Sequence, residues 1–152
     1  MSVHSRRVTL LSDTDPEPVE WINRESDVPV LLVCEHAGRA VPASLVGLGL
    51  AKGAVDDHIG WDIGAMGVAR RLAEKLGAPL VAQRYSRLVI DCNRPPESAS
   101  AMPATSDQQP VPGNAGLTSD QCSLRVREIF APFAAAVESA FDKHTRCIAI
   151  SI

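Results

Sequence analysis

The sequence lacks any apolar run close to the ~18 residues that a membrane-spanning helix needs. Its N-terminal residues also lack the apolar stretch of a secretory signal peptide. No block of basic residues is present and the net charge is −3, which argues against nucleic acid and anionic membranes as partners. These absences make the cytoplasm the expected location and a small molecule the expected partner.

The four cysteines do not form a C-x-x-C pair, and no internal repeat or low-complexity segment interrupts the chain. We therefore expect free thiols in a reducing compartment, with Cys34 and Cys92 inside strands. With 152 residues, 45% of them hydrophobic, the chain suits a single globular domain. Residues 1–27 are polar and rich in Asp, Glu and Pro, which predicts an N-terminal arm held by Trp21, followed by one domain over residues 28–152.

Short apolar runs and helical spacing alternate along that domain. The runs predict strands at residues 28–34, 79–83, 87–92 and 147–152. The tight link between the second and third runs predicts an antiparallel pair, and the order of elements predicts an α/β fold with a mixed sheet. The loop 95–117 is long enough to suggest a function of its own.

Two helices are predicted between these strands. The first extends from Asp62 as N-cap to Gly77 as C-cap. The second begins with a capping box formed by Thr118 and Gln121. Pro132 lies inside the apolar pattern of this second helix, so we expect a kink or a break there.

Polar residues follow the first predicted strand in "CEHAG", where ligands gather in α/β sheets. His36 could ligate a metal, act as a base, or form a hydrogen bond in the core. Cys34 and His36 share a strand face, which raises a Cys–His nucleophile as an alternative, although side chains two apart do not naturally meet.

A second polar group lies in "DDHIGWDIG", where His58 and Asp62 are four residues apart. On a helix that begins early they would share a face, and both side chains suit Zn²⁺. The alternative is a capped helix start with acidic residues near its positive end.

The stretch "RYSRLVIDCNRPP" is unusually polar for a buried strand. Arg87, Asp91 and Asn93 would share one strand face, but Arg87 and Asp91 are too far apart along it to pair directly. Each therefore needs another partner or a ligand, and an arginine fork matches a carboxylate. Alternatively, Asp91 and Arg94 tie down the loop that follows.

Taken in order, "CEHAG", "HIGWDIGA", "YSRLVIDCNRP" and "PGN" resemble the N-formylglutamate amidohydrolase family over residues 28–133. The resemblance implies a mixed sheet flanked by helices in a phosphorylase/hydrolase-like fold, related to zinc-dependent carboxypeptidases and aspartoacylases. It also implies metal-dependent hydrolysis of N-formyl-L-glutamate, or a related N-acyl amino acid, to L-glutamate and formate in histidine catabolism.

The resemblance also implies roles for individual residues. The residues expected to bind the substrate carboxylate are Arg87, Asn93 and Arg94. The expected Zn²⁺ ligands are His36 together with Asp62 or His58, and Glu35 is either a further ligand or the catalytic base. Bound Zn²⁺ would polarise the formyl oxygen and lower the pKa of a water molecule toward ~7.

Three departures accompany this resemblance. Arg39 occupies the position where a His-x-x-Glu spacing needs glutamate, Ala134 follows Pro132 and Phe133 where we expect histidine, and "IAISI" ends before an expected His-Ser-Phe. The family pattern thus implies a domain incomplete at its C-terminus, with a metal ligand missing and an unfinished sheet open to self-association. The alternative to an active enzyme is therefore a catalytically inactive relic or a carboxylate-binding module.

Overall fold

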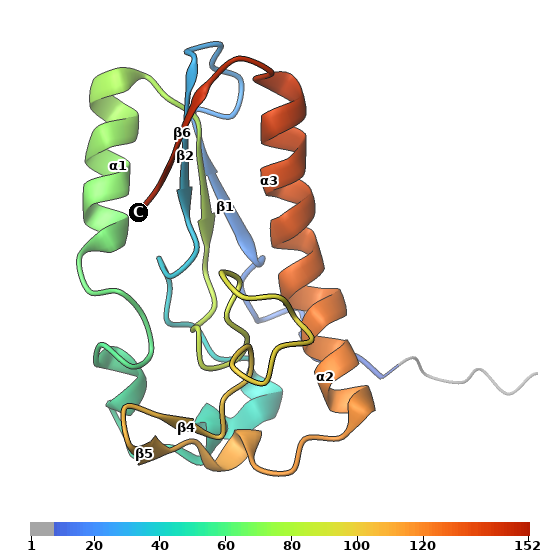
Figure 1. Cartoon of the computed structure of the whole chain (residues 1–152). Coiled ribbons are helices and arrows are strands. Elements are labelled where there is room, and N and C mark those ends of the chain that lie inside the picture. Colours follow the sequence, from blue (N-terminus) through green and yellow to red (C-terminus); the bar gives the residue numbers. More distant parts are fainter. Residues whose placement is uncertain (1–7) are drawn as a thin grey trace, which may run out of the picture.

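A mixed four-stranded sheet forms the centre of the fold (Figure 1), and the computed structural model describes residues 8–152. Residues 1–7 of the predicted arm lie outside the described part. The strands are Val19–Ile22 (β1), Val30–Cys34 (β2), Leu80–Gln83 (β3) and Ile148–Ser151 (β6), in the order β1-β3-β2-β6. β2 is parallel to β3 and β6, and β1 is antiparallel to β3, so the prediction of a mixed α/β sheet is confirmed.

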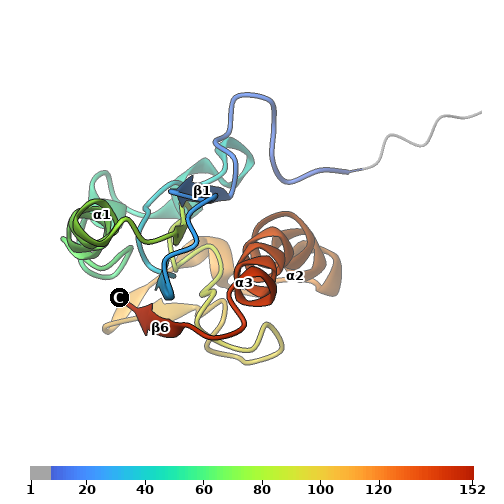
Figure 2. The same ribbon diagram turned by 90° about the horizontal axis from the view of Figure 1, so that it is seen from above.

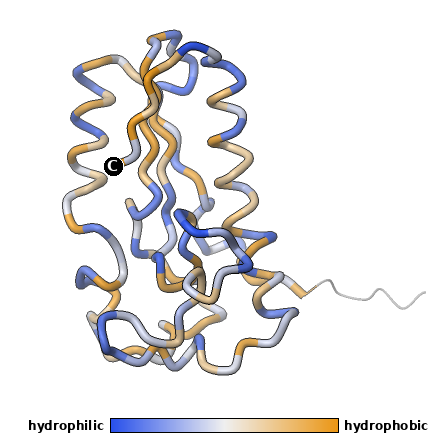
Figure 3. Tube along the Cα trace, viewed as in Figure 1, coloured by the Kyte–Doolittle hydropathy of each residue, from blue (hydrophilic) through white to orange (hydrophobic). Residues whose placement is uncertain are grey.

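Helices α1 (Ala65–Leu76) and α3 (Ala131–Lys143) cover opposite faces of this sheet (Figure 2). Because side chains alternate along a strand, Leu32 packs toward the buried Ala69 and Ala73 of α1, whereas Leu31 packs with Phe133 of α3. Apolar residues follow the strands in Figure 3. These layers are consistent with a hydrolase-like fold.

The prediction of a strand at residues 87–92 is wrong. β3 already pairs with β1 on one side and with β2 on the other, so no free edge remains beside it. Residues 87–92 instead follow an irregular course, in which Val89 N donates to Ser86 O and Asp91 N donates to Ala101 O. The antiparallel partner of β3 is β1, which comes from the predicted N-terminal arm.

The helix ends follow the predicted signals in part. Gly77 caps α1 in the left-handed conformation, but Gly64 and not Asp62 is its N-cap. Helix α2 (Ser119–Arg125) begins with both hydrogen bonds of the Thr118–Gln121 capping box. A π-helical turn, Val126–Phe130, then joins α2 to α3 without a break, because the backbone stays helical from one helix into the next. Pro132 lies in the first turn of α3, directly after this irregular turn.

The remaining elements lie at the edges of the sheet and below it. The loop 95–117 contains a short hairpin, Thr105–Ser106 (β4) with Gln109–Pro110 (β5). β6 was predicted to be buried, but its residues are exposed because only β2 pairs with it, and self-association through this sheet stays a prediction. Among the residues that the structure covers, no helix combines the length and the apolar character of a membrane span.

Candidate active site

Two loops cross beyond the carboxyl ends of β2 and β3, and this crossing creates the site. Ala40 N donates to Arg84 O at 3.1 Å, and Ser86 N donates back to Ala40 O at 2.8 Å. The backbones approach so closely that a Cβ atom on Gly38 would lie 2.0 Å from Arg84 O. His36, at the start of one loop, is thereby fixed beside residues 86–91 of the other.

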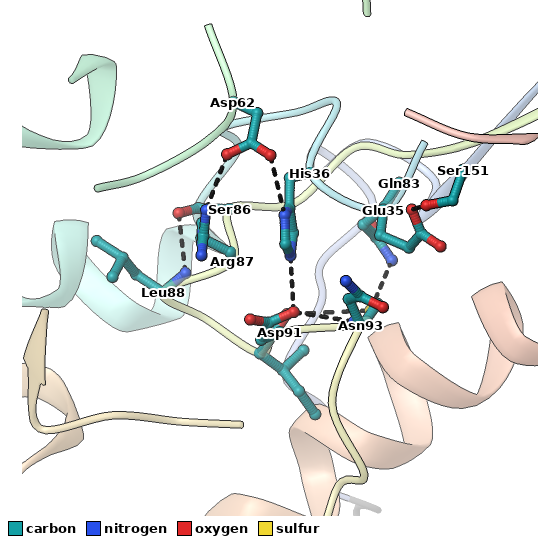
Figure 4. A network of polar contacts seen from close by, with 12 residues as sticks. Glu35, His36, Asp62, Gln83, Ser86, Arg87, Leu88, Asp91, Asn93 and Ser151 are labelled. Atoms are coloured by element: carbon teal, nitrogen blue, oxygen red, sulfur yellow. Dashed lines mark hydrogen bonds and ion pairs between the residues drawn. The ribbon is translucent and has the colours of Figure 1, made fainter. Parts of the chain in front are cut away.

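The imidazole of His36 lies between two carboxylates (Figure 4). Nδ1 is 3.2 Å from Asp62 Oδ2, and Nε2 is 2.7 Å from Asp91 Oδ1. The His36 and Asp91 side chains are 11% and 9% exposed, whereas that of Asp62 is 47% exposed. One side of the ring is therefore closed by protein, and the Asp62 side is open to solvent.

The two carboxylates determine the charge of this ring. A neutral imidazole has only one N–H, so it can donate to one carboxylate but not to both. Burial by itself lowers the pKa of His36, but the hydrogen bond and charge of Asp91 outweigh burial, and the pKa is raised overall. The protonated ring, which donates to both Asp62 and Asp91, is therefore favoured.

Asp62 connects His36 to Arg87. Its backbone N–H donates to His36 O at 3.1 Å, and its Oδ1 accepts from Arg87 Nη1 at 2.8 Å. Because the carboxylate is engaged in this way, it does not cap α1. The predicted need of Arg87 for a partner beyond its own strand is met by Asp62.

Asp91 is the buried carboxylate of the site, and sequence analysis did not include it among the site residues. Besides His36, it accepts a hydrogen bond from Asn93 N at 2.9 Å. Burial raises the pKa of Asp91, but the hydrogen bonds from His36 and from Asn93 N lower it below its ordinary value overall. The signal for this role was a carboxylate within an apolar run, which demands a buried partner.

Asn93 and Arg94 follow directly, and both are exposed. Within residues 8–152, no hydrogen bond or ion pair of either side chain is found. An unengaged amide and an unengaged guanidinium are therefore carried by the residues that follow Asp91 in the chain, and an anionic ligand could bind them.

Glu35 and His58 lie apart from this cluster. Glu35 is adjacent to His36 in sequence, but its side chain points away and its Oε2 accepts from Ser151 Oγ of β6 at 2.9 Å (Figure 4). Glu35 also lines an apolar cavity of about 430 Å³ between β2 and α3. His58 is exposed and contacts Asp57 and Asp107, so the structure does not bring it to Asp62.

Comparison with known proteins identifies the family of the chain that carries this cluster. The N-formylglutamate amidohydrolase family model matches residues 28–152. The chain belongs to this family. The cluster of His36, Asp62, Arg87 and Asp91 and the free Asn93–Arg94 pair are thus all within the region shared with N-formylglutamate amidohydrolases.

Two solved structures are similar to this family member. A gene product of Agrobacterium tumefaciens has a TM-score of 0.91 and 38% identity, over 94% of this chain and 58% of that chain. An N-formylglutamate amidohydrolase from Ralstonia eutropha has a TM-score of 0.58 and 19% identity, over 90% of this chain and 56% of that one. The second shows the shared fold alone, and this chain spans less than two thirds of either structure. No curated protein matches the chain.

The donor groups of the cluster suit a divalent metal in part. A metal binds a deprotonated imidazole nitrogen, so it would replace the proton between His36 and Asp62 on the open side. Asp91 would then orient the ring from behind, as carboxylates commonly do for metal-bound histidines. Two predicted ligands thus fit, but no group of three or more metal-binding side chains forms within residues 8–152.

The cysteine alternative does not fit the family member's structure. All four thiols are free, as predicted. Cys34 is completely buried, and burial raises its pKa to about 12, as it does for Cys92. A nucleophilic cysteine needs an accessible thiolate of low pKa, so neither residue has the properties of a nucleophile.

Proposed function

We propose that this chain carries the substrate-binding part of a site that hydrolyses N-formyl-L-glutamate, or a related N-acyl amino acid, to L-glutamate and formate. The observation that carries the proposal is the convergence of His36, Asp62, Arg87 and Asp91. Two exposed polar residues, Asn93 and Arg94, follow Asp91 in the chain. Membership of the N-formylglutamate amidohydrolase family supports the same reaction. A role in histidine catabolism, a cytoplasmic location and a relation to zinc carboxypeptidases stay predictions.

The substrate is an anion, and the site offers suitable groups for it. Arg94 and Asn93 would bind one carboxylate by charge-assisted hydrogen bonds. Arg87 would contribute a second positive charge, since its side chain is 32% exposed and only Nη1 is bound to Asp62. A substrate with two carboxylates benefits from two cationic contacts, which favours an acidic amino acid over a neutral one.

Hydrolysis also needs a metal or another activating group and a base. We propose that His36 and Asp62 are two ligands of a divalent metal such as Zn²⁺, which when bound would polarise the carbonyl oxygen and acidify water. Glu35 remains our proposed base, because a carboxylate can move a proton to the leaving amine. In this structure its carboxylate contacts Ser151 of β6 and not the His36 cluster.

Measurement of formate release tests the reaction. The variant Arg94→Gln tests whether Arg94 binds the substrate carboxylate. Loss of a charged hydrogen bond costs about 1.5–3 kcal/mol, which corresponds to about a 10- to 100-fold rise in KM for N-formyl-L-glutamate. Arg71→Gln is the matched control, because Arg71 is an exposed residue of α1. If KM rises equally in both variants, or stays unchanged in both, Arg94 does not bind the substrate carboxylate as proposed.

Zinc titration by calorimetry tests the metal ligands. His36→Ala should weaken Zn²⁺ binding by more than the ~10–100-fold typical of losing a group behind a ligand. His58→Ala should leave binding unchanged, because His58 lies on the surface with Asp57 and Asp107. If both variants bind zinc like the wild type, His36 is not a ligand.

The second candidate is a binding module without turnover. It is favoured by the two-donor arrangement, since catalytic zinc normally has three protein ligands. A binding module would give calorimetric binding of N-formyl-L-glutamate that Arg94→Gln weakens, with no formate released in the presence of zinc. Formate release at stoichiometric zinc would exclude it.

A further inference from the structure

Arg125 is a buried cation that the proposed reaction does not use. Its residue is 1% exposed. Nη1 donates to Val89 O at 2.9 Å and to Asn114 Oδ1 at 2.7 Å, and Nη2 donates to Gly113 O at 3.1 Å. Within residues 8–152, no carboxylate lies within ion-pair distance of it. Burying a cation without a carboxylate partner costs free energy. The hydrogen bonds that Arg125 donates to neutral acceptors must offset this cost.

Asn114, which is 4% exposed, binds the carbonyl group of Leu88, the residue before Val89. Its Nδ2 donates to Leu88 O at 2.8 Å and to Pro103 O at 2.9 Å. The turn that carries Asn114 packs closely against the backbone of Leu48, since a Cβ atom on Gly113 would lie 2.8 Å from Leu48 Cα. Arg125 and Asn114 thus hold two successive carbonyl groups, those of Leu88 and Val89.

Those carbonyls belong to the irregular segment 87–91, which has no strand ladder to satisfy them. Buried carbonyl groups without partners are costly, so the side chains of Arg125 and Asn114 replace the missing neighbouring strand. The two carbonyls lie between Arg87, which binds Asp62, and Asp91, which binds His36. Any shift of Leu88 or Val89 would therefore change both contacts of the site.

We propose that Arg125 and Asn114 are positioning residues that fix segment 87–91, and through it the geometry of Arg87, Asp91 and the Asn93–Arg94 pair. The inference rests on the proposed function for its kinetic consequence, but its structural consequence is independent. Only a planar guanidinium can reach Val89 O, Asn114 Oδ1 and Gly113 O together, because the compact ammonium group of lysine lacks its wide fork.

Two mild variants test this inference, so that failure to fold does not decide the result. Arg125→Lys keeps the charge but loses the fork, and Asn114→Asp keeps an acceptor for Arg125 but loses the donor to Leu88 O. Arg127→Lys, two residues away on the exposed side, is the control. In an active enzyme, both test variants should raise KM for N-formyl-L-glutamate about tenfold.

A merely structural role would leave KM unchanged, because partial unfolding lowers only the concentration of active enzyme and hence the apparent kcat. Unchanged KM in both test variants would therefore overturn the inference. If the wild type releases no formate, the proposed function fails, and hydrogen–deuterium exchange then decides the positioning role alone. Faster exchange of the amides in residues 87–94 in Arg125→Lys, but not in Arg127→Lys, would support it, and unchanged exchange would overturn it.

Discussion

Gly38→Ala should lower the free energy of unfolding by about 3 kcal/mol, at the upper end of overpacking effects. The new Cβ atom would lie 2.0 Å from Arg84 O and 2.6 Å from Arg84 Cα, so it would meet backbone atoms and not a flexible side chain. The two crossing loops would have to separate, which also breaks the paired hydrogen bonds between Ala40 and residues 84–86. Urea denaturation followed by circular dichroism measures the change.

Gly67→Ala is the matched control for this prediction. Gly67 is an exposed residue of α1, and a Cβ atom there would meet nothing within 4 Å. Alanine in place of glycine in a helix interior should raise stability by about 0.5–1 kcal/mol. If Gly38→Ala proves as harmless as Gly67→Ala, the two loops do not cross as closely as described.

Asp91→Asn should have the second largest effect, because it removes the nearer and more buried of the two counter-ions of the His36 ring and leaves only Asp62. The His36 and Asp91 side chains are both nearly buried, so we expect a loss of about 2–3 kcal/mol at pH 5, somewhat below the cost of breaking a fully buried pair. The asparagine can still accept a hydrogen bond, which limits the loss. Metal-free protein, unfolded in urea over a range of pH, is the sample to use.

The pH dependence of this effect follows from the two pKa shifts. The pKa of His36 is raised, so its stabilising contribution is complete below the unfolded value of 6.5 and is lost as pH rises through the higher folded value. The pKa of Asp91 is lowered, so its contribution is present above 3.8 and is lost as pH falls through the lower folded value. The difference between wild type and Asp91→Asn should therefore be largest between 3.8 and 6.5.

Asp57→Asn provides the control for an exposed pair. Asp57 contacts His58 on the surface, where water and salt screen the charges. We expect its pH–stability profile to match the wild type. A gap between wild type and Asp91→Asn that stays constant from pH 5 to pH 9 would show that the charge of His36 does not contribute.

Several elements of the fold could be predicted from local chemistry alone. The apolar run of β2, the left-handed cap at Gly77 and the capping box at Thr118 depend on neighbours a few residues away. The irregular π-helical turn before Pro132 is equally local, because proline removes a helical donor wherever it stands. Family motifs extended these predictions to the residues that we propose bind the substrate.

Other features depended on distant parts of the chain. Residues 87–92 have the composition of a strand, but they cannot pair with β3, because β1 and β2 pair with its two edges. His58 and Asp62 would share a helical face only if the helix began early, but α1 begins at Ala65, so the two side chains diverge. The role of Asp91 could not be assigned before the loops were seen to cross, because its partner His36 is 55 residues away.

The sequence by itself determined the strands β2, β3 and β6, the two helical regions, the free thiols and the family of this protein, because apolar periodicity, capping residues and motifs act over short distances. Only the tertiary structure decided that His36 is held between Asp62 and Asp91, that Glu35 and His58 lie elsewhere, and that Arg125 supports the irregular segment. The reason is that a buried charge is stable only beside a partner, and which partner reaches it depends on where the loops cross.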